Sequence, residues 1–259
     1  LPGLENARLS TAALTALDAD IAWFHRYING RHLSLVGICV GGSLALAAAA
    51  RPENAGAIHA VVAIDPYAQV KDLMEAAATG QGPDAAGQPA PFDMAAWVRA
   101  DLVRSVAGGT IRDEASRQAI LAALARSPQT DPLEAFRQVP PNGLSPVAAA
   151  WWRILGNRDP AAFDALYQAL PEDARAELAE LSPLTNAARL SAPVLLAAPL
   201  NDFAFPAGEA PALERANSRR IRLIRSSALD HVTPSFGFSV LAGYWQLLRF
   251  AVEGNSLLR

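Results

Sequence analysis

The chain has 259 residues, of which 51% are hydrophobic and 18% are charged, the proportions of an ordinary globular protein with one large core or a core plus an insertion. The formal net charge is −3, and the longest cationic run is the pair Arg219 and Arg220, so the sequence lacks the basic stripe of a nucleic-acid-binding protein. The longest apolar run, residues 44–50, is too short to be a transmembrane segment.

The single cysteine, Cys39, cannot form an internal disulfide, and on that ground we expect a cytoplasmic protein. The chain opens with LPGLENARLS and has no initial methionine. This opening fits a removed leader as well as a stretch of a longer protein, so the expected compartment stays open.

The first half of the chain alternates predicted helices and strands. Apolar side chains recur every three or four positions over residues 10–29, which predicts an amphipathic helix that ends at Gly30. The run HLSLVGI has little alternation, which is typical of a strand buried on both faces of a parallel sheet. An alanine-rich helix and a second buried strand, residues 57–65, follow it. This order predicts an α/β protein.

Residues 68–185 depart from the alternation of helices and strands, and their pattern predicts a helical insertion. The segment TGQGPDAAGQPAPF, residues 79–92, is expected to form a mobile loop. Three helices are expected to begin where a capping side chain precedes a proline, at residues 131–132, 145–146 and 159–160. The large apolar side chains of this region are Trp97, Phe136, Trp151, Trp152, Phe163 and Tyr167.

The α/β pattern resumes with strands at residues 194–198 and 221–227, a helix at 208–216 between them, and a final helix at 237–253. We therefore divide the chain into an α/β core, residues 1–67 and 186–259, and a helical cap or lid, residues 68–185. The cap is expected over the carboxyl ends of the strands, where open α/β sheets bind ligands.

Cys39 lies in the sequence GICVGG, at the turn between the first strand and the alanine-rich helix. The spacing matches a nucleophile elbow with cysteine in place of serine. The tight turn strains the backbone of the nucleophile, and side chains at Gly37 and Gly41 would collide with neighbouring backbone; Gly42 completes the elbow. The start of the following helix favours a thiolate, and the N–H of Val40 can stabilise an oxyanion.

A nucleophile of this kind needs an acid and a histidine, which this architecture places later in the chain and in that order. Asp202 follows the strand at 194–198, and His231 follows the strand at 221–227, so each stands just past a carboxyl end. Asp65 also ends a strand and is the alternative acid. Asp230 is expected to be exposed.

The other three histidines have less suitable positions. His25 lies within the first predicted helix, and His32 and His59 lie at strand entrances, the wrong end of a parallel sheet for catalysis. We expect all three to be structural.

Several segments together resemble the α/β-hydrolase superfamily across nearly the whole chain: the elbow GICVGG, the acid loop LNDFAFP, the lead-in SPLTNAARLSAPVLL and the late histidine. The elbow resembles the nucleophile motifs of dienelactone hydrolases and polyhydroxyalkanoate synthases, which use Cys, Asp and His. The resemblance implies that Cys39, Asp202 and His231 form a catalytic triad. The long cap departs from the compact dienelactone hydrolases, so no subfamily is assigned.

The opening LPGLENARLS resembles the loop after the fourth strand of such hydrolases. By that resemblance the first strands are absent from this chain, and with them the second oxyanion donor. We expect those residues to precede Leu1 in the natural protein.

These features predict a hydrolase that acts on an activated ester or thioester through a thioester acyl-enzyme. Because a thiolate leaves more readily than an alkoxide, thioesters, enol lactones and aryl esters are expected to react faster than alkyl esters. An acyltransferase or polymer synthase of the same fold and an inactive binding protein are the alternatives.

The expected partner is a small-molecule acyl substrate, and the apolar residues of the cap fit a hydrophobic acyl group as well as they fit packing of the cap itself. The sequence has no zinc-ligand spacing and no dinucleotide fingerprint, so we expect no metal and no cofactor.

Overall fold

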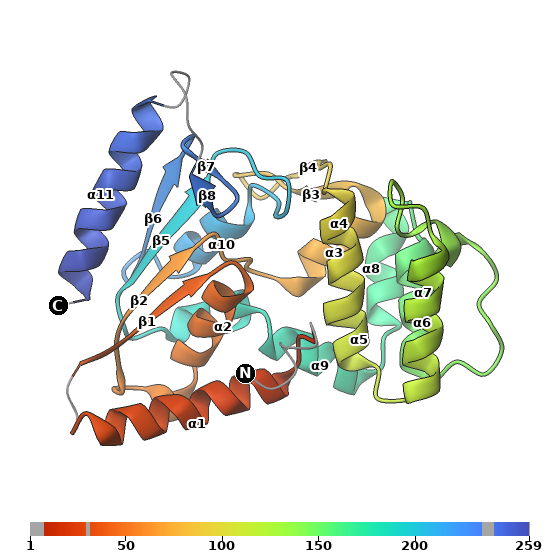
Figure 1. Cartoon of the computed structure of the whole chain (residues 1–259), viewed down its shortest axis with the longest axis horizontal. Coiled ribbons are helices and arrows are strands. Elements are labelled where there is room, and N and C mark those ends of the chain that lie inside the picture. The colour runs from red at the N-terminus through yellow and green to blue at the C-terminus, as the bar shows by residue number, and fades with distance from the viewer. Residues whose placement is uncertain (1–7, 30–31, 235–240, 259) are drawn as a thin grey trace.

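The computed structural model describes residues 8–29, 32–234 and 241–258 (Figure 1). Its centre is a four-stranded parallel sheet in the order β1-β2-β5-β6. The strands are β1 (Leu33–Ile38), β2 (Ile58–Ile64), β5 (Val194–Pro199) and β6 (Ile221–Ser226). The parallel sheet flanked by helices that the sequence predicts is confirmed. Gly30, the heptapeptide at positions 1–7 and the start of the final helix predicted at 237 lie outside the described residues.

Helices cover both faces of the sheet. The helices α1 (Thr11–Tyr27), α2 (Val40–Ala49) and α10 (Glu209–Ala216) pack on one face, where the larger core contains Leu14, Leu44 and Leu213. The helix α11 (Leu241–Leu257) lies on the other face, where Phe250 and Leu257 contact a smaller cluster (Figure 1). That cluster consists of Val62, Leu195 and Ile224. Within the part of the chain that the structure describes, no helix is long and apolar enough to cross a membrane.

The expectation that β1 is buried on both faces is wrong. β1 is an edge strand of the described sheet, and Val36 and Ile38 are 62% and 53% exposed. The reason is geometric: α11 packs against β5 and β6 and covers that side of the sheet, while β1 lies at the opposite edge. Continuous apolar sequence therefore marks a strand without showing that both of its faces are covered.

Between β2 and β5 the chain forms a helical segment that lies beside the sheet (Figure 1). Its helices are α3 (Val70–Thr79), α4 (Ala96–Leu102), α5 (Gly108–Thr110), α6 (Glu114–Arg126), α7 (Pro146–Gly156), α8 (Pro160–Gln168) and α9 (Glu172–Glu180). A π-helical turn, Val103–Ala107, joins α4 to α5. The side chains of Trp151, Phe163, Phe136 and Trp152 are buried within this segment, so most of its aromatic residues pack the helices together.

Two predictions within this segment need correction. The residues expected to form a mobile loop make an antiparallel hairpin, β3 (Gln81–Pro83) with β4 (Pro89–Pro91). Asp84 closes the hairpin, because its Oδ1 accepts the N–H groups of Ala86 and Gln88 at 2.8 Å.

Of the three predicted helix starts, two are confirmed. Ser145 caps α7 and Asp159 caps α8, each with a proline at the first helical position. Asp131 instead caps a turn, and only a short 3₁₀ helix, Glu134–Arg137, follows it. A capping residue before a proline is therefore insufficient where the following residues do not continue as an α-helix.

Candidate functional site

Cys39 stands at the turn between β1 and α2, at the carboxyl end of its strand. Its backbone has φ 53° and ψ −127°, a strained conformation for a residue with a side chain, and its N–H donates to Ile64 O at 2.8 Å. Cys39 occupies the N-cap position of α2 without a capping hydrogen bond from its side chain, and it is half-buried. Val40 opens that helix, so its N–H lies in the first turn, where backbone donors have no acceptor within the helix.

The three glycines of the elbow have different surroundings. A Cβ at Gly37 would lie 2.5 Å from Gly41 O and 2.6 Å from the Cα of Gly42, a collision with backbone that excludes any side chain. At Gly42 a Cβ would lie 3.2 Å from the Cβ of Ala63, a tight contact. The expected collision at Gly41 is wrong, because a Cβ there meets nothing within 4 Å: this residue faces outward from the first turn of α2.

His231 is held in a short hairpin after β6, formed by β7 (Leu229–Asp230) and β8 (Thr233–Pro234). Its side chain is buried, and the rings of Phe203 and Phe205 lie 5.4 and 5.1 Å from the imidazole. Asp230, its neighbour in sequence, is exposed as expected. The two phenylalanines belong to the acid loop, so one segment supplies both a carboxylate and an apolar wall to His231.

Two carboxyl groups approach the same nitrogen of His231. The Nδ1 makes a hydrogen bond with Asp202 Oδ2 at 3.3 Å. Asp65 Oδ2 lies closer, 2.6 Å from Nδ1, but it is off the direction of an N–H···O hydrogen bond and is a buried oxygen without a hydrogen-bond partner among the described residues. The preferred acid and the alternative acid of the sequence analysis thus lie side by side.

Backbone strain is concentrated at these residues. Among the described residues four that are not glycine have a positive φ: Asn29, Cys39 at 53°, Asp65 at 48° and His231 at 53°. Strained backbone persists where the surrounding structure holds it, and it gathers at functional sites. Three of the four candidate residues share this feature, which the sequence did not reveal.

The pKa values of the three polar side chains diverge. Burial raises the pKa of Asp65 to about 8. Burial would also raise the pKa of Asp202, but hydrogen bonds with His231, with Asp65 and from the Ala204 N–H outweigh it and lower that pKa. Burial acts against a charged His231, whereas the hydrogen bond with Asp202 and the nearby side chains of Asp65 and Cys39 raise the pKa of the imidazole well above its ordinary value.

The Cys39 side chain lies near enough to His231 to help raise the pKa of the imidazole, so His231 joins the elbow to the carboxyl groups. Because Nδ1 faces the carboxyl groups, the other ring nitrogen, Nε2, is left for the thiol. This arrangement can move a proton from sulfur to the imidazole while a carboxylate fixes the tautomer.

Asp65, Asp202 and His231 are also the set within the described residues whose side-chain atoms lie close enough together, within 4.8 Å, to hold a metal ion. The short Nδ1 contact with Asp65 and the hydrogen bond with Asp202 are those of an acid–base cluster, in which Nδ1 carries a proton. A metal ion would have to displace that proton, so we interpret the cluster as acid–base machinery.

The remaining histidines gather at the other end of the sheet. His25, His32 and His59 line a cavity of about 440 Å³ with Ile58 and Pro193, next to the amino ends of β2 and β5, and the rings of His32 and His59 lie 4.2 Å apart. They lie away from the carboxyl ends of the strands, as their sequence positions predict.

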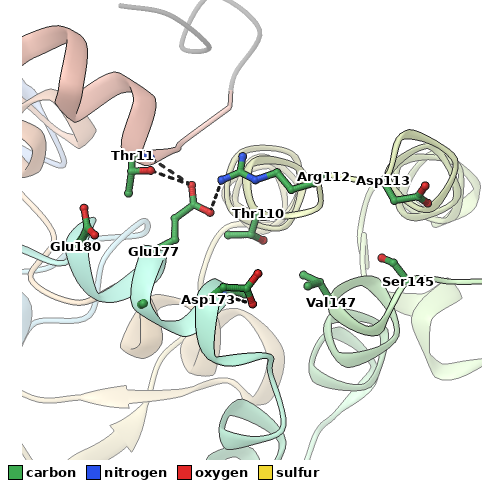
Figure 2. Close-up of a pocket in the computed structure, with 11 residues that line it drawn as sticks. Thr11, Thr110, Arg112, Asp113, Ser145, Val147, Asp173, Glu177 and Glu180 are labelled. Atoms are coloured by element: carbon green, nitrogen blue, oxygen red, sulfur yellow. Dashed lines mark hydrogen bonds and ion pairs between the residues drawn. The ribbon is translucent and has the colours of Figure 1, made fainter.

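Two larger cavities border the helical segment. One, of about 580 Å³, lies between α1, α6, α7 and α9, where Glu177 accepts hydrogen bonds from Thr11 and Arg112 (Figure 2). It is lined by neither Cys39 nor His231. The other, of about 610 Å³, is bordered by Trp97, Ala100 and Leu124.

Trp97 links the second cavity to the candidate site. Its ring is 58% exposed and lies 5.7 Å from the ring of Phe203, which in turn contacts His231. Phe203 was not singled out from the sequence. Its position directly after the acid, in a loop with a second phenylalanine, is the signal that could have identified it.

No protein-family model matches the chain, and neither does any curated protein. Similar solved structures include a monoacylglycerol lipase from Paleococcus ferrophilus, which is 15% identical, with 97% of this chain and 76% of that one covered and a TM-score of 0.41. An alpha/beta fold family hydrolase from Bacillus anthracis str. Sterne is 13% identical, with 93% and 73% covered and a TM-score of 0.43. An E-2-(acetamidomethylene)succinate hydrolase is 18% identical, with 93% and 72% covered and a TM-score of 0.38. Likeness at this level says nothing about substrate, so function has to come from the residues of the site.

Proposed function

We propose that the protein is an acyl-transferring hydrolase in which Cys39 is the nucleophile, His231 the general base and acid, and Asp202 the carboxylate that orients the imidazole. The observation that carries this proposal is the contact chain from a strained cysteine through His231 to a buried carboxylate. A buried structural cysteine would need neither the strained backbone nor a histidine held by carboxyl groups.

The first half-reaction follows from this geometry. His231 Nε2 takes the thiol proton, and the Cys39 sulfur attacks the acyl carbonyl while the carbonyl electron pair moves onto oxygen, near the Val40 N–H. The tetrahedral intermediate collapses to a thioester, and the imidazolium returns the proton to the departing alcohol or thiol. Water then attacks the thioester, His231 takes its proton, and the proton is returned to the Cys39 sulfur as the carboxylic acid leaves.

The leaving groups decide the substrate class. Because a thiolate is a better leaving group than an alkoxide, the tetrahedral intermediate formed from a simple alkyl ester would expel the Cys39 sulfur and regenerate the substrate. We therefore propose activated esters and acyl thioesters as substrates, with water as the acceptor.

The acyl group is proposed to be hydrophobic and to extend toward Trp97. Support comes from the exposed face of Trp97, its contact with Phe203, and the cavity that Trp97 shares with Ala100 and Leu124. The other large aromatic residues of the helical segment are buried against one another, so packing accounts for them. We propose that residues 68–185 act as the cap of this site.

The test is to measure turnover of p-nitrophenyl esters and acyl thioesters, and alkylation of the thiol by iodoacetamide, for the wild type and Cys39→Ala. We expect mutant-sensitive turnover, with thioesters faster than matched ethyl esters. An unreactive thiol at neutral pH and turnover indifferent to Cys39→Ala would reject Cys39 as the nucleophile, and the absence of any turnover would favour a binding protein.

A further inference from the structure

The candidate site contains one carboxyl group more than a nucleophile, base and acid require. As a donor, the Nδ1 of His231 has one proton to give, and the hydrogen-bond direction from this nitrogen is toward Asp202 Oδ2. Asp65 Oδ2 is nevertheless 2.6 Å from the same nitrogen, with 4% of the Asp65 surface exposed. An ionised Asp65 would place a second buried negative charge beside Asp202 without a hydrogen bond of its own to the imidazole.

The two carboxyl groups differ in their other partners. Asp202 Oδ1 accepts the Ala204 N–H at 2.9 Å, and its Oδ2 accepts the Phe205 N–H at 3.2 Å, so the turn of the acid loop stabilises a negative charge. Asp65 Oδ2 has no such donor among the described residues. When two neighbouring carboxyl groups hold one proton, the proton resides on the group with less support for its charge, which here is Asp65.

We propose that Asp65 and Asp202 share one proton at neutral pH, with Asp65 as a neutral carboxylic acid that donates to the Asp202 carboxylate and fixes it against His231. The inference rests on the proposed function, because it assigns Asp65 a part in the same machinery. Asp65 is a positioning residue, since it acts on the reacting atoms through Asp202 and His231. It keeps its proton throughout the cycle, and the proton that moves passes between sulfur, Nε2 and the leaving group.

The shared proton has a consequence for the base. With Asp65 neutral, His231 faces one carboxylate and can still return its proton to the leaving group. If Asp65 loses its proton, a second negative charge holds the imidazolium proton more tightly and also opposes a thiolate on Cys39. Among the described residues the buried carboxyl of Glu209 also interacts with Asp65, and a charge on Glu209 would keep the Asp65 proton in place. Turnover is therefore expected to fall as the pH rises through the titration of Asp65.

The protonation states are measured directly by ¹³C NMR of the protein labelled at the aspartate carboxyl carbons, titrated with pH. Asp65→Asn and Asp202→Asn assign the two resonances. We expect Asp202 to be ionised at neutral pH and Asp65 to titrate in the alkaline range, near its pKa of about 8. An Asp65 that is ionised at neutral pH overturns the proposal, and this measurement requires no catalytic activity.

The kinetic test compares Asp65→Ala, Asp65→Asn and Asp202→Asn, with Asp230→Asn as a matched control at an exposed neighbour of His231. Asp202→Asn is expected to lose the most, up to about 10⁴-fold in kcat. Asp65→Ala removes one hydrogen bond to a charged group, which costs about 10- to 100-fold. Asp65→Asn keeps an N–H donor for Asp202, so it should recover most of that loss and should lack the alkaline decline of the wild type.

The outcomes separate the two hypotheses. If Asp65→Asn loses more activity than Asp202→Asn, Asp65 is the ionised acid and the proposal is wrong. If Asp65→Asn and Asp65→Ala lose equally, a donor at this position has no role, which also overturns it. Turnover that is indifferent to Cys39→Ala rejects the proposed function instead, and the carboxyl titration then decides the shared proton by itself.

Discussion

The histidines at the two ends of the central sheet differ in their partners and in their backbone conformation. At the amino ends of the strands, His25, His32 and His59 line one cavity, and the Nδ1 of His25 is buried without a hydrogen-bond partner among the described residues. At the carboxyl ends, a single histidine, His231, has strained backbone and contacts with a thiol and two carboxyl groups. Partners and backbone strain, rather than the number of imidazoles, distinguish a site that can move protons.

The largest expected effect tests this contrast directly with the same substitution at both ends. His231→Gln removes the general base and acid and is expected to lower kcat/KM for acyl thioesters by about 10²- to 10⁴-fold. His59→Gln, in the histidine cavity, should leave kcat/KM unchanged. Steady-state kinetics on one thioester substrate measures both, and equal losses in the two variants would refute the distinction between the ends.

A second pair of substitutions separates substrate contact from packing among the aromatic residues of the helical segment. Trp152 is buried against Phe136 and donates its indole N–H to Gln138 O at 2.9 Å, so Trp152→Ala is expected to cost about 3 to 5 kcal/mol of unfolding free energy. Trp97 is 58% exposed beside Phe203, so Trp97→Ala should cost far less stability.

Trp97→Ala should instead act on specificity, lowering kcat/KM for long-chain acyl thioesters by about 10- to 100-fold, since a lost apolar contact is worth about 1 to 3 kcal/mol. Activity on acetyl thioesters should be retained. Chain-length profiles and urea unfolding distinguish these effects, and an equal loss on both chain lengths would place the acyl group elsewhere.

A third pair of substitutions tests the glycines of the elbow, at the carboxyl end of β1. Gly37→Ala forces a Cβ to 2.5 Å from backbone oxygen and is expected to cost about 1 to 3 kcal/mol of unfolding free energy. Gly41→Ala meets open space in the first turn of a helix, where alanine is favoured over glycine, so it should raise the unfolding free energy by up to about 1 kcal/mol. Urea denaturation of both variants is the measurement, and a stable Gly37→Ala would show that the turn can relax.

The sequence predicted local and periodic features well, because strands, helix caps and the elbow depend on neighbouring residues. It placed Cys39, Asp202 and His231 at the carboxyl ends of predicted strands, in the order nucleophile, acid, histidine. The relation between Asp65 and Asp202 could not be predicted, because it depends on how two loops 137 positions apart, after β2 and β5, meet around one imidazole.

The exposure of individual side chains could not be predicted from the sequence either. Val36 and Ile38 resemble core residues, and their exposure follows from the place of β1 at the sheet edge. Gly41 and Gly37 belong to the same motif, yet a Cβ added at Gly41 would point into open space, whereas one added at Gly37 would collide with backbone. Tertiary arrangement, which is not encoded in a local pattern, determines all of these cases.

The last expected effect concerns a buried carboxyl group behind the site, Glu209. Its Oε2 accepts the N–H groups of Ala68 and Gln69 at 2.6 and 2.9 Å and thereby holds the segment that follows Asp65. Burial raises the pKa of Glu209 from 4.5 to about 8, so the folded protein binds this proton more tightly than the unfolded chain. The resulting stabilisation is complete below pH 4.5 and is lost as the pH rises toward 8.

Glu209→Gln cannot ionise, so its unfolding free energy should decline less steeply than that of the wild type over this range, by up to about 1.4 kcal/mol for each pH unit. The decline should be shallower rather than absent, because the raised pKa of Asp65 contributes a loss of the same sign. Glu209→Ala is the control: it removes the acceptor as well as the charge, so it should share the shallower pH dependence at lower stability throughout. Urea unfolding at several pH values measures all three proteins, and parallel curves for wild type and Glu209→Gln would mean that Glu209 is ionised in the folded state and that the site faces one more negative charge than proposed.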